Sequence, residues 1–279
     1  MIIEENAYQS PDEHQTYGQM WLPDSNITGM ILVIHGLGEH CGRYATHFSD
    51  FYTFNNYGVA AFDLPGHGKS SGKKGHINNP FSLLEIIDNQ IKIINDRFPN
   101  LPLFIYGHSF GGEIAIWYTL VRKPDINGLI LSAPLIGPKD PVPFAKLILA
   151  KTLEKIMPSF CLNNGLNTDF LSRDPRIVNE YRADPLVHNK VSSKTGMMII
   201  NRGKWIMNNI HDNTGRILMM AGENEAIVNP EAIKSLAVKA PKIQLKIWPD
   251  LYHELHNEPE KEEVMAFTLD WMKNTKTIL

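Results

Sequence analysis

Residues 107–111 read Gly-His-Ser-Phe-Gly and directly follow a short apolar run, Leu-Pro-Leu-Phe-Ile-Tyr, at residues 101–106. The chain continues as Gly-Glu-Ile-Ala-Ile-Trp at residues 112–117, so this segment predicts a strand, a sharp turn and a helix. Glycines on both sides of Ser109 permit a turn tight enough to lift the serine side chain clear of a sheet. The amide groups at the start of the following helix would face the place where an oxyanion forms. The sequence therefore predicts a nucleophile elbow centred on Ser109.

The sequence around the elbow alternates between strand and helix patterns. Short apolar strand candidates occupy residues 30–34, 58–62, 103–106, 128–132, 217–220 and 243–247. Helical patterns occupy residues 45–56, 80–98 and 259–273. In the second of these helices, apolar residues recur at spacings of three and four, which is typical of an amphipathic helix. The alternation predicts an α/β protein with a mostly parallel central sheet and helices on both of its faces.

One interval interrupts this alternation. Residues 144–157 are apolar over most of a helical circumference, and residues 192–210 are rich in Met and Ile. Helices of this kind bury their apolar surface against protein, a lipid-like substrate or a membrane face, and protein is the commonest of the three. We expect residues 1–136 and 216–279 to form a core domain. Residues 137–215 would then be a helical cap inserted over the active site.

The bulk composition is that of a soluble globular protein. The chain has 279 residues, 43% of them hydrophobic, and its 27 Lys and Arg against 30 Asp and Glu give a net charge of −3. This near balance, without a basic run, argues against a nucleic-acid partner. Cys41 and Cys161 lie far apart and lack a C-x-x-C spacing, as expected of reduced thiols in the cytoplasm. Residues 1–5 lack the pattern of a signal peptide, and no run approaches the ~20 apolar residues that cross a bilayer.

A serine nucleophile needs a base, and the base needs an acid that orients it. After an elbow of this kind, the acid and then the histidine are expected later in the chain, each following a strand. The last predicted strand is followed by Pro-Asp-Leu-Tyr-His-Glu-Leu-His at residues 249–256, so we predict His253 as the base. His256 is the competing candidate. The run His-Glu-Leu-His is one residue too short for the zinc-binding H-E-x-x-H pattern.

The acid should follow the predicted strand at residues 217–220. The loop that comes next contains Glu223 and Glu225. We predict Glu225 as the acid, with Glu223 as the alternative. A glutamate can orient an imidazole as an aspartate does, although its extra methylene changes the reach by ~1.5 Å.

The second oxyanion donor is expected in the loop after the strand at residues 30–34. Residues 35–40 read His-Gly-Leu-Gly-Glu-His, and their glycines free the backbone to present the amide of Leu37. This amide would act together with the amide of Phe110. Removal of one such donor typically costs ~3 kcal/mol of transition-state stabilisation.

Two further patterns could be mistaken for ligand sites. The cluster of metal-binding residue types near the N-terminus lacks paired spacing and a second ligand set, so we expect no metal site there. It comprises His35, His40, Cys41 and His47. Residues 68–70 imitate the end of a phosphate-binding loop, but Asp63 stands where the leading glycine belongs. We predict a structural turn there and no nucleotide.

Taken together, the motifs resemble those of the monoacylglycerol lipases, which are serine hydrolases of the α/β-hydrolase fold. The resemblance covers nearly the whole chain and is specific as an ordered set, although single motifs recur in lysophospholipases and related esterases. It rests on residues 35–40, 42–44, 63–68, 107–112, 181–186, 252–253 and 255–256. One departure is Glu225, because the family has an aspartate at that position.

The resemblance implies a cap over a hydrophobic acyl tunnel, with the glycerol head group held by polar residues near the serine. It places Glu39, Arg43, Tyr181 and His256 around the head group and His108 beside the nucleophile. Glycerol hydroxyls need buried hydrogen-bond partners, which gives polar residues there a physical purpose.

The sequence thus predicts a serine ester hydrolase that acts on monoacylglycerols or similar single-chain esters, with no metal or organic cofactor. An apolar cap would also let the protein touch a lipid surface from the cytoplasm. A lysophospholipase, a short-chain carboxylesterase or a peptidase on the same scaffold is the alternative within enzymes. A scaffold that binds an acyl ligand without turnover is the alternative outside them.

Overall fold

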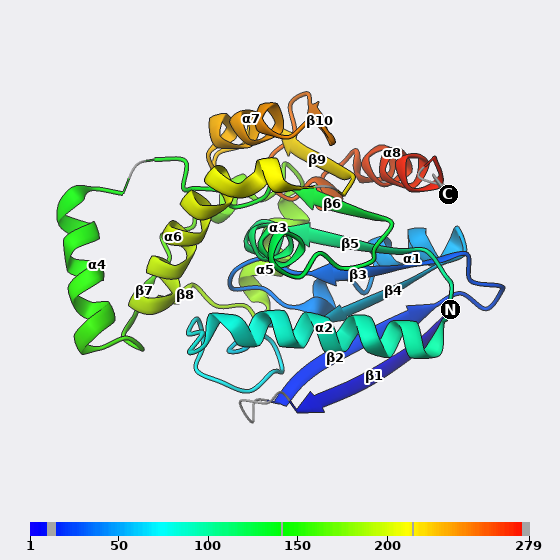
Figure 1. Cartoon of the computed structure of the whole chain (residues 1–279), viewed down its shortest axis with the longest axis horizontal. Helices are drawn as coiled ribbons and strands as arrows, with labels where there is room; N and C mark the ends of the chain where they lie inside the picture. Colours follow the sequence, from blue (N-terminus) through cyan, green and yellow to red (C-terminus); the bar gives the residue numbers. More distant parts are fainter. Residues whose placement is uncertain (10–14, 141, 214, 275–279) are drawn as a thin grey trace.

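The computed structural model describes residues 1–9, 15–140, 142–213 and 215–274. Its centre is an eight-stranded sheet of order β1-β2-β4-β3-β5-β6-β9-β10 (Figure 1). The strands are β1 (Ile2–Gln9), β2 (Gln15–Leu22), β3 (Gly29–Ile34), β4 (Tyr57–Phe62), β5 (Leu103–His108), β6 (Gly128–Ser132), β9 (Ile217–Gly222) and β10 (Ile243–Trp248). All neighbouring pairs from β4 to β10 are parallel, which confirms the predicted sheet. The antiparallel pairs β1–β2 and β2–β4 add an edge that the strand pattern did not predict.

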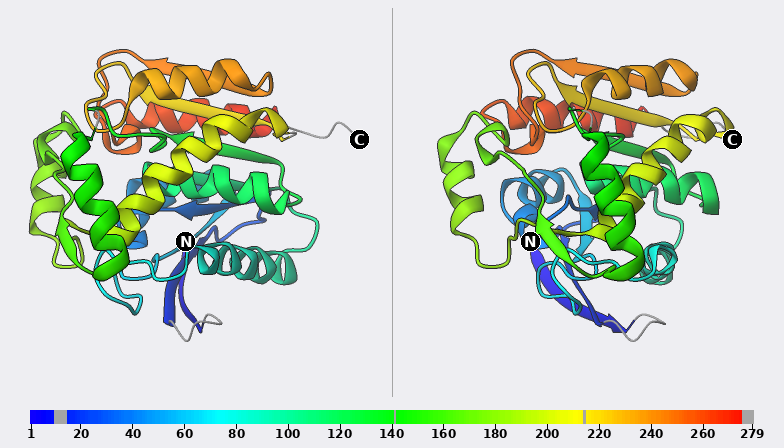
Figure 2. Two further views of the ribbon diagram at one scale, coloured as in Figure 1. Left: turned by 60° about the vertical axis from the view of Figure 1, so that its left-hand side comes forward. Right: turned by 90° about the vertical axis from the view of Figure 1, so that its left-hand side faces the viewer.

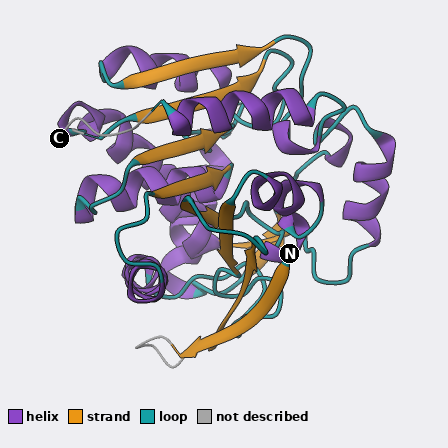
Figure 3. Ribbon diagram, turned by 90° about the vertical axis from the view of Figure 1, so that its right-hand side faces the viewer, coloured by secondary structure: helices purple, strands orange, loops and turns teal. Residues whose placement is uncertain are grey.

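Helices cover both faces of this sheet (Figure 3). The helices of the sheet layers are α1 (His47–Phe54), α2 (Pro80–Arg97), α3 (Phe110–Arg122), α7 (Pro230–Lys239) and α8 (Lys261–Lys273). Apolar side chains of α1 and α8 form one buried cluster with the sheet, and those of α2, α3 and α7 form another on the opposite face. The fold class predicted from the sequence is therefore confirmed.

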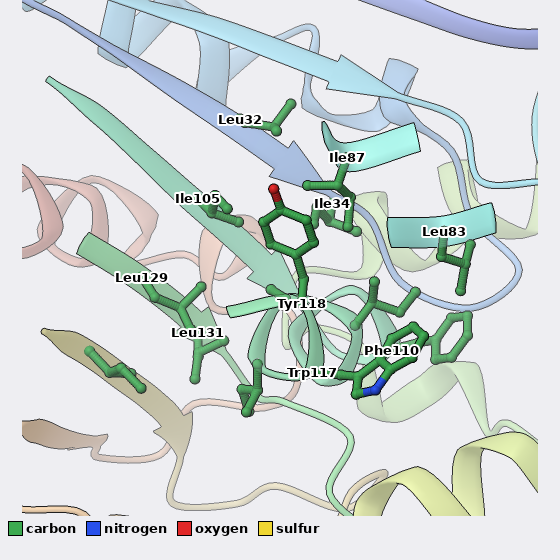
Figure 4. Close-up of a cluster of buried hydrophobic side chains, with 14 of the residues drawn as sticks. Leu32, Ile34, Leu83, Ile87, Ile105, Phe110, Trp117, Tyr118, Leu129 and Leu131 are labelled. Carbon is green, nitrogen blue, oxygen red and sulfur yellow. The ribbon is translucent and has the colours of Figure 1, made fainter. Parts of the chain in front are cut away.

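Successive residues of the central strands supply these two clusters alternately. In β3, Leu32 and Ile34 face the α2 and α3 side, whereas Val33 faces the α1 and α8 side. A strand that is buried on both faces must be apolar at every position, which explains the continuous apolar runs in the sequence. Figure 4 shows the cluster on the α2 and α3 side, in which Leu32 and Ile105 of neighbouring strands lie beside Tyr118 of α3.

Between β6 and β9 the chain forms a separate group of elements, which we call the cap segment (residues 137–215). It contains α4 (Phe144–Ile156), β7 (Cys161–Asn163), α5 (Pro175–Ala183), β8 (Lys190–Ser192) and α6 (Ser193–Asn209). Helix α6 packs against α3 through Ile199 and Ile206, and β7 pairs with β8. Helix α4 lies along the outer side of α6, away from the sheet, and has no buried residue (Figures 1 and 2).

Two details of the helices differ from the sequence prediction. The closing helix begins at Lys261 and not at residue 259. Glu258 is extended, with φ −73° and ψ 162°, because a following proline disfavours the helical conformation, and Pro259 then lies in a turn. Helices α5 and α7 were not predicted, since each is short and buries only two side chains.

Candidate active site

Ser109 occupies the turn between β5 and α3 in a strained conformation. Its φ of 51° and ψ of −115° lie outside the regions that a non-glycine residue normally adopts. The turn is fixed by two backbone hydrogen bonds: Ser109 donates to Ser132 O at 2.9 Å, and Leu135 N donates to Ser109 O at 2.8 Å. Backbone strain of this kind is typical of functional sites.

The glycines around Ser109 are needed for close packing. A Cβ atom on Gly111 would lie 2.0 Å from the carbonyl oxygen of Ile34 in β3. A Cβ atom on Gly107 would lie 2.7 Å from the carbonyl oxygen of Gly111. The glycines therefore let the first turn of α3 rest directly on the sheet, as the elbow prediction requires.

The predicted base and acid are in contact. His253 lies on the loop after β10, and its Nδ1 is 2.8 Å from Glu225 Oε2, on the loop after β9. Both side chains are almost completely buried. Because the carboxyl ends of parallel strands meet at one edge of the sheet, these loops lie near the elbow, and His253 and Ser109 line the same cavity.

The longer side chain of Glu225 has a use in this loop. Its Oε1 accepts hydrogen bonds from the amides of Ile227 at 2.7 Å and Val228 at 3.1 Å, which leaves Oε2 for His253. Glu223 is exposed, and its carboxylate accepts a hydrogen bond from the amide of Asp250 at 3.4 Å. Of the two candidate acids, only Glu225 contacts His253.

Burial and charge oppose each other at this pair. Burial would raise the pKa of Glu225, but the charge of His253 and three hydrogen bonds outweigh it and lower that pKa. Burial likewise disfavours a charged His253, yet the carboxylates of Glu225, Glu254 and Glu39 raise its pKa above the ordinary value. The site thus favours a carboxylate on Glu225 and a basic imidazole on His253.

Two backbone amides are available where an oxyanion would form. Phe110 is the first residue of α3, so its amide has no partner within the helix. Leu37 lines the same cavity as Ser109 and follows Gly36, whose amide donates to Glu39 Oε1 at 2.6 Å. The structure therefore brings both predicted donors to the neighbourhood of the serine.

The cavity above Ser109 has a volume of about 540 Å³. Its apolar lining comes from both the core and the cap segment and includes Leu37, Leu135, Leu166, Phe170, Ile199 and Ile227. Its polar lining near the serine includes Glu39, His108, Tyr181, His253 and Glu254. The cavity is therefore suited to a ligand with an apolar chain and a small polar end.

Two residues that the resemblance assigns to the head group lie behind this lining. Arg43 donates to Glu39 Oε2 at 2.6 Å and holds both carboxylate oxygens of Glu254, while its guanidinium covers the ring of Tyr181. His256 is buried, stacked on Tyr44 with ring centroids 4.9 Å apart.

His108, which precedes Ser109 in the chain, is packed between two other imidazoles. Its ring centroid is 4.8 Å from that of His253 and 5.0 Å from that of His256. Burial, together with the nearby charge of His253, lowers the pKa of His108 to about 4. His108 is therefore neutral at physiological pH.

Sequence reasoning missed Glu254. It follows the predicted base directly and is buried, with Arg43 and Asn257 as donors to its carboxylate. The available signal was an acidic residue next to the predicted base, which by itself does not distinguish a buried hydrogen-bond partner from a solvated loop residue.

The histidine and cysteine cluster near the N-terminus and the segment at residues 63–70 form structural hydrogen bonds. Asp63 accepts hydrogen bonds from the amides of Cys41 and Lys69, both at 2.7 Å, and so closes the turn at residues 63–70. Within the described ranges, no three His, Cys, Asp or Glu side chains are arranged to hold a metal ion.

Comparisons with known proteins indicate the family of this chain. The family model Hydrolase_4, described as "Serine aminopeptidase, S33", matches residues 25–260. A monoacylglycerol lipase of Mycolicibacterium smegmatis is 31% identical over 256 residues, which cover 91% of each protein. An uncharacterized abhydrolase domain-containing protein of Dictyostelium discoideum is 36% identical over 257 residues, and the chain spans 27% of the length of that protein.

Solved structures show the same architecture. The crystal structure of the Paleococcus ferrophilus monoacylglycerol lipase superimposes with a TM-score of 0.82 at 30% identity, covering 99% of this chain and 100% of the other. A soluble variant of the Saccharomyces cerevisiae monoglyceride lipase, in complex with a substrate analog, has a TM-score of 0.87 over 99% and 97% of the two chains. Its identity of 23% supports the fold alone. Because the family model covers most of its length, this chain belongs to the Hydrolase_4 family and is an α/β-hydrolase similar to monoacylglycerol lipases.

Proposed function

We propose that this protein is a serine ester hydrolase that cleaves monoacylglycerols to a fatty acid and glycerol. The observation that carries the proposal is the 2.8 Å contact between His253 Nδ1 and Glu225 Oε2. His253 and Ser109 line the same cavity. The names of the Mycolicibacterium smegmatis relative and of the Rattus norvegicus monoglyceride lipase, 28% identical over 251 residues, support the substrate class.

The reaction follows from the roles of the three side chains. His253 Nε2 takes the proton of Ser109 as the serine oxygen attacks the ester carbonyl, and Glu225 stabilises the resulting imidazolium. The amides of Leu37 and Phe110 hold the oxyanion. His253 then gives the proton to the glycerol oxygen, so that glycerol departs and the acyl group stays bound to Ser109 as an acyl-enzyme. Water then attacks the acyl group with His253 as base, and the fatty acid departs from a regenerated Ser109.

The substrate is a single-chain ester because the cavity combines a largely apolar lining with polar side chains, Glu39, His108 and Tyr181 among them. In this proposal residues 137–215 are a cap, and its side chains cover the acyl chain together with Leu37 and Leu135 of the core. Glu39 and Tyr181 on the cavity wall receive the glycerol head group. His108 lies beside the nucleophile, and Arg43 and His256 support this region from behind.

The first test is labelling by a fluorophosphonate, which reacts with an activated serine. We expect an adduct on Ser109 in the wild-type protein and none in Ser109→Ala or His253→Ala. A wild-type protein that binds fatty acid but does not label would be an acyl-ligand binder and would contradict the proposal.

The second test is a substrate profile with matched head groups and chain lengths. We expect medium- and long-chain monoacylglycerols to be hydrolysed with a higher kcat/KM than lysophospholipids, acetyl esters or aminoacyl p-nitroanilides. A preference for any of the other three classes would assign the protein as a lysophospholipase, a short-chain carboxylesterase or a peptidase instead.

We also propose that α4 brings the enzyme to a lipid surface. Phe144, Ile148 and Ile156 of this helix are 77%, 49% and 71% exposed, and lysines at positions 146, 151 and 155 accompany them. Exposed apolar side chains interleaved with lysine are typical of helices that lie in a membrane interface. No helix in the described part of the chain has the length and hydropathy to span a membrane.

Cys41 and Cys161 are unpaired, which supports a cytoplasmic location.

Vesicle sedimentation tests the surface contact. We expect the wild-type protein to sediment with vesicles containing anionic phospholipid and Phe144→Ser/Ile148→Ser to remain in the supernatant. The matched control is Phe54→Ser/Val238→Ser, which removes two apolar residues that are even more exposed, at 88% and 87%, outside the cap segment. Equal sedimentation of both double variants would refute a contact through α4.

A further inference from the structure

A second buried network of charges adjoins the proposed catalytic base. Glu254 follows His253, and its two carboxylate oxygens accept hydrogen bonds from Arg43 at 2.5 and 2.7 Å. Asn257 Nδ2 donates a third hydrogen bond at 2.7 Å. Glu254 is 1% exposed, so its carboxylate requires hydrogen-bond donors from the protein to compensate for its burial.

The same guanidinium reaches the loop that carries the oxyanion donor. Arg43 donates to Glu39 Oε2 at 2.6 Å. The other oxygen of Glu39 accepts from the amide of Gly36 at 2.6 Å and from the hydroxyl of Tyr44 at 3.2 Å. Gly36 directly precedes Leu37. An unbroken chain of short contacts therefore joins the loop of His253 to the amide that would bind the oxyanion.

We propose that Arg43 and Glu254 are positioning residues. Together with Glu39, which also lines the cavity, they fix the base and the oxyanion donor relative to each other. The inference rests on the proposed roles of Ser109, His253 and Leu37. A guanidinium suits this task because its planar donors bind two carboxylates in fixed directions, which the single ammonium of a lysine cannot do. Displacement of a catalytic group by about 1 Å can cost roughly 100-fold in rate.

The network also carries charge. Two carboxylates share one guanidinium, which leaves one excess negative charge beside His253. Burial opposes ionisation of Glu254, but Arg43 holds its pKa at about 2, and Arg43 likewise lowers the pKa of Glu39. The excess charge stabilises the imidazolium that His253 becomes while Ser109 attacks.

The other titratable groups around His253 do not cancel this charge. His108 and His256 are neutral because burial lowers the pKa of each, and Tyr44 and Tyr181 stay protonated because burial raises theirs. On the opposite side of the ring, Glu225 adds a negative charge of its own.

The experiment compares three single variants and one double variant by ester kinetics. Glu254→Gln and Glu39→Gln should each lower kcat by roughly 10- to 100-fold. The double variant should be at most about 3-fold slower than the slower single variant, because residues that act as one unit are not additive. Arg43→Lys keeps the charge but loses the bidentate geometry, so it should also lower kcat. Multiplicative losses in the double variant would show that the two carboxylates act separately and would overturn the inference.

The pH profile separates positioning from a purely structural role. His253 must be neutral to accept the serine proton, so activity falls as the pH drops through its pKa. Removal of a negative charge in Glu254→Gln lowers that pKa and should move the acid limb of kcat/KM to lower pH. Arg43→Lys preserves the net charge and should leave the limb in place. An unshifted limb in Glu254→Gln would refute the electrostatic part.

Arg173→Gln is the matched control. Arg173 forms an ion pair with Glu258, in the loop of His253, without contacting Glu39 or Arg43. The Arg173→Gln variant should keep wild-type kcat even if its Tm falls, and each variant is compared at equal folded fraction.

Fluorophosphonate labelling distinguishes failure of the proposed function from failure of this inference. A wild-type protein that does not label refutes the proposed function, whereas equal labelling rates for wild type and Glu254→Gln refute this inference alone.

Discussion

At the residue scale, the site depends on a few side chains held in unusual environments. The positive φ of Ser109 costs on the order of 1–3 kcal/mol, which its hydrogen bonds with Ser132 and Leu135 help to offset. Glu225 is ionised although it is buried, because one oxygen serves two backbone amides and the other serves His253. Both features lie where the chemistry is proposed to occur.

Glu225→Gln tests the orientation of the imidazole. The carboxamide can still accept from the backbone amides through its oxygen, but its NH2 group would then face His253 Nδ1. That contact favours the tautomer with the proton on Nε2, which cannot accept the proton of Ser109. We expect kcat to fall by roughly 10⁴-fold in an ester assay. The control Glu223→Gln changes an exposed acid two residues away and should retain wild-type kcat.

The pH dependence of kcat/KM reports the pKa of His253 in the free enzyme. The surrounding carboxylates raise that pKa, so the base becomes protonated at a higher pH than an ordinary histidine. We expect activity to be lost on acidification with a midpoint above ~6.5. His108 does not contribute to this limb, since its pKa is about 4. A midpoint below 6 would contradict the assigned electrostatics.

At the element scale, the close approach of α3 to β3 fixes the position of Ser109. The first turn of the helix lies so near the strand that the position of Gly111 has no room for a side chain. The apolar residues of α3, including Phe110 and Tyr118, then complete the cluster beneath α2 (Figure 4). The absence of a side chain at Gly111 is therefore a requirement both for the packing of α3 on the sheet and for the orientation of Ser109.

Gly111→Ala tests that requirement. The added Cβ would meet the Ile34 carbonyl oxygen at 2.0 Å, so the helix must move off the sheet. We expect the free energy of unfolding to fall by about 3 kcal/mol, measured by urea denaturation. Gly196→Ala in α6 is the control for stability, because its Cβ would find only Val191 Cγ2 at 3.9 Å. Its higher helix propensity should stabilise the fold by about 0.5–1 kcal/mol.

At the scale of the whole molecule, two buried ionisable side chains lie where the cap segment packs on the core. Glu113 of α3 is fully buried, and Arg202 of α6 is 5% exposed. The guanidinium of Arg202 lies 4.1 Å from the ring centroid of Trp117, which is a cation–π contact. Burial disfavours both charges: it raises the pKa of Glu113 well above its ordinary value and lowers the pKa of Arg202, while the charge of each residue partly opposes the shift of the other. Neither the carboxylate oxygens of Glu113 nor the terminal nitrogens of Arg202 have a hydrogen-bond partner in the described part of the structure.

Substitutions at this junction should show strong coupling. Glu113→Leu removes the carboxyl group whose charge favours the buried guanidinium of Arg202, and we expect a loss of about 1–3 kcal/mol in the free energy of unfolding. Glu113→Leu/Arg202→Met replaces the pair by apolar side chains and should recover stability to within about 1 kcal/mol of wild type. Additive losses in thermal or urea unfolding would show that the two side chains do not interact.

The sequence by itself determined the fold class and the family of this protein. Strands buried on both faces must be apolar throughout, as at residues 30–34, and the glycines around Ser109 are required by the turn itself, so both signals are local. The order serine, acid, histidine also follows from the chain, because each residue comes after a strand whose carboxyl end lies at the same sheet edge. The assignments to Ser109, Glu225 and His253 stay predictions that the contacts support.

Only the tertiary structure decided which polar groups meet. Glu254 and Arg43 are separated by 211 residues, and no periodicity or motif links them. The sequence also does not distinguish Glu225 from Glu223, because both lie in one loop. Only the structure shows that Glu225 is buried against His253, whereas Glu223 is exposed and accepts from the amide of Asp250. A buried charge is stable only when specific partners surround it, and those partners come from loops and helices that the folding of the sheet brings together.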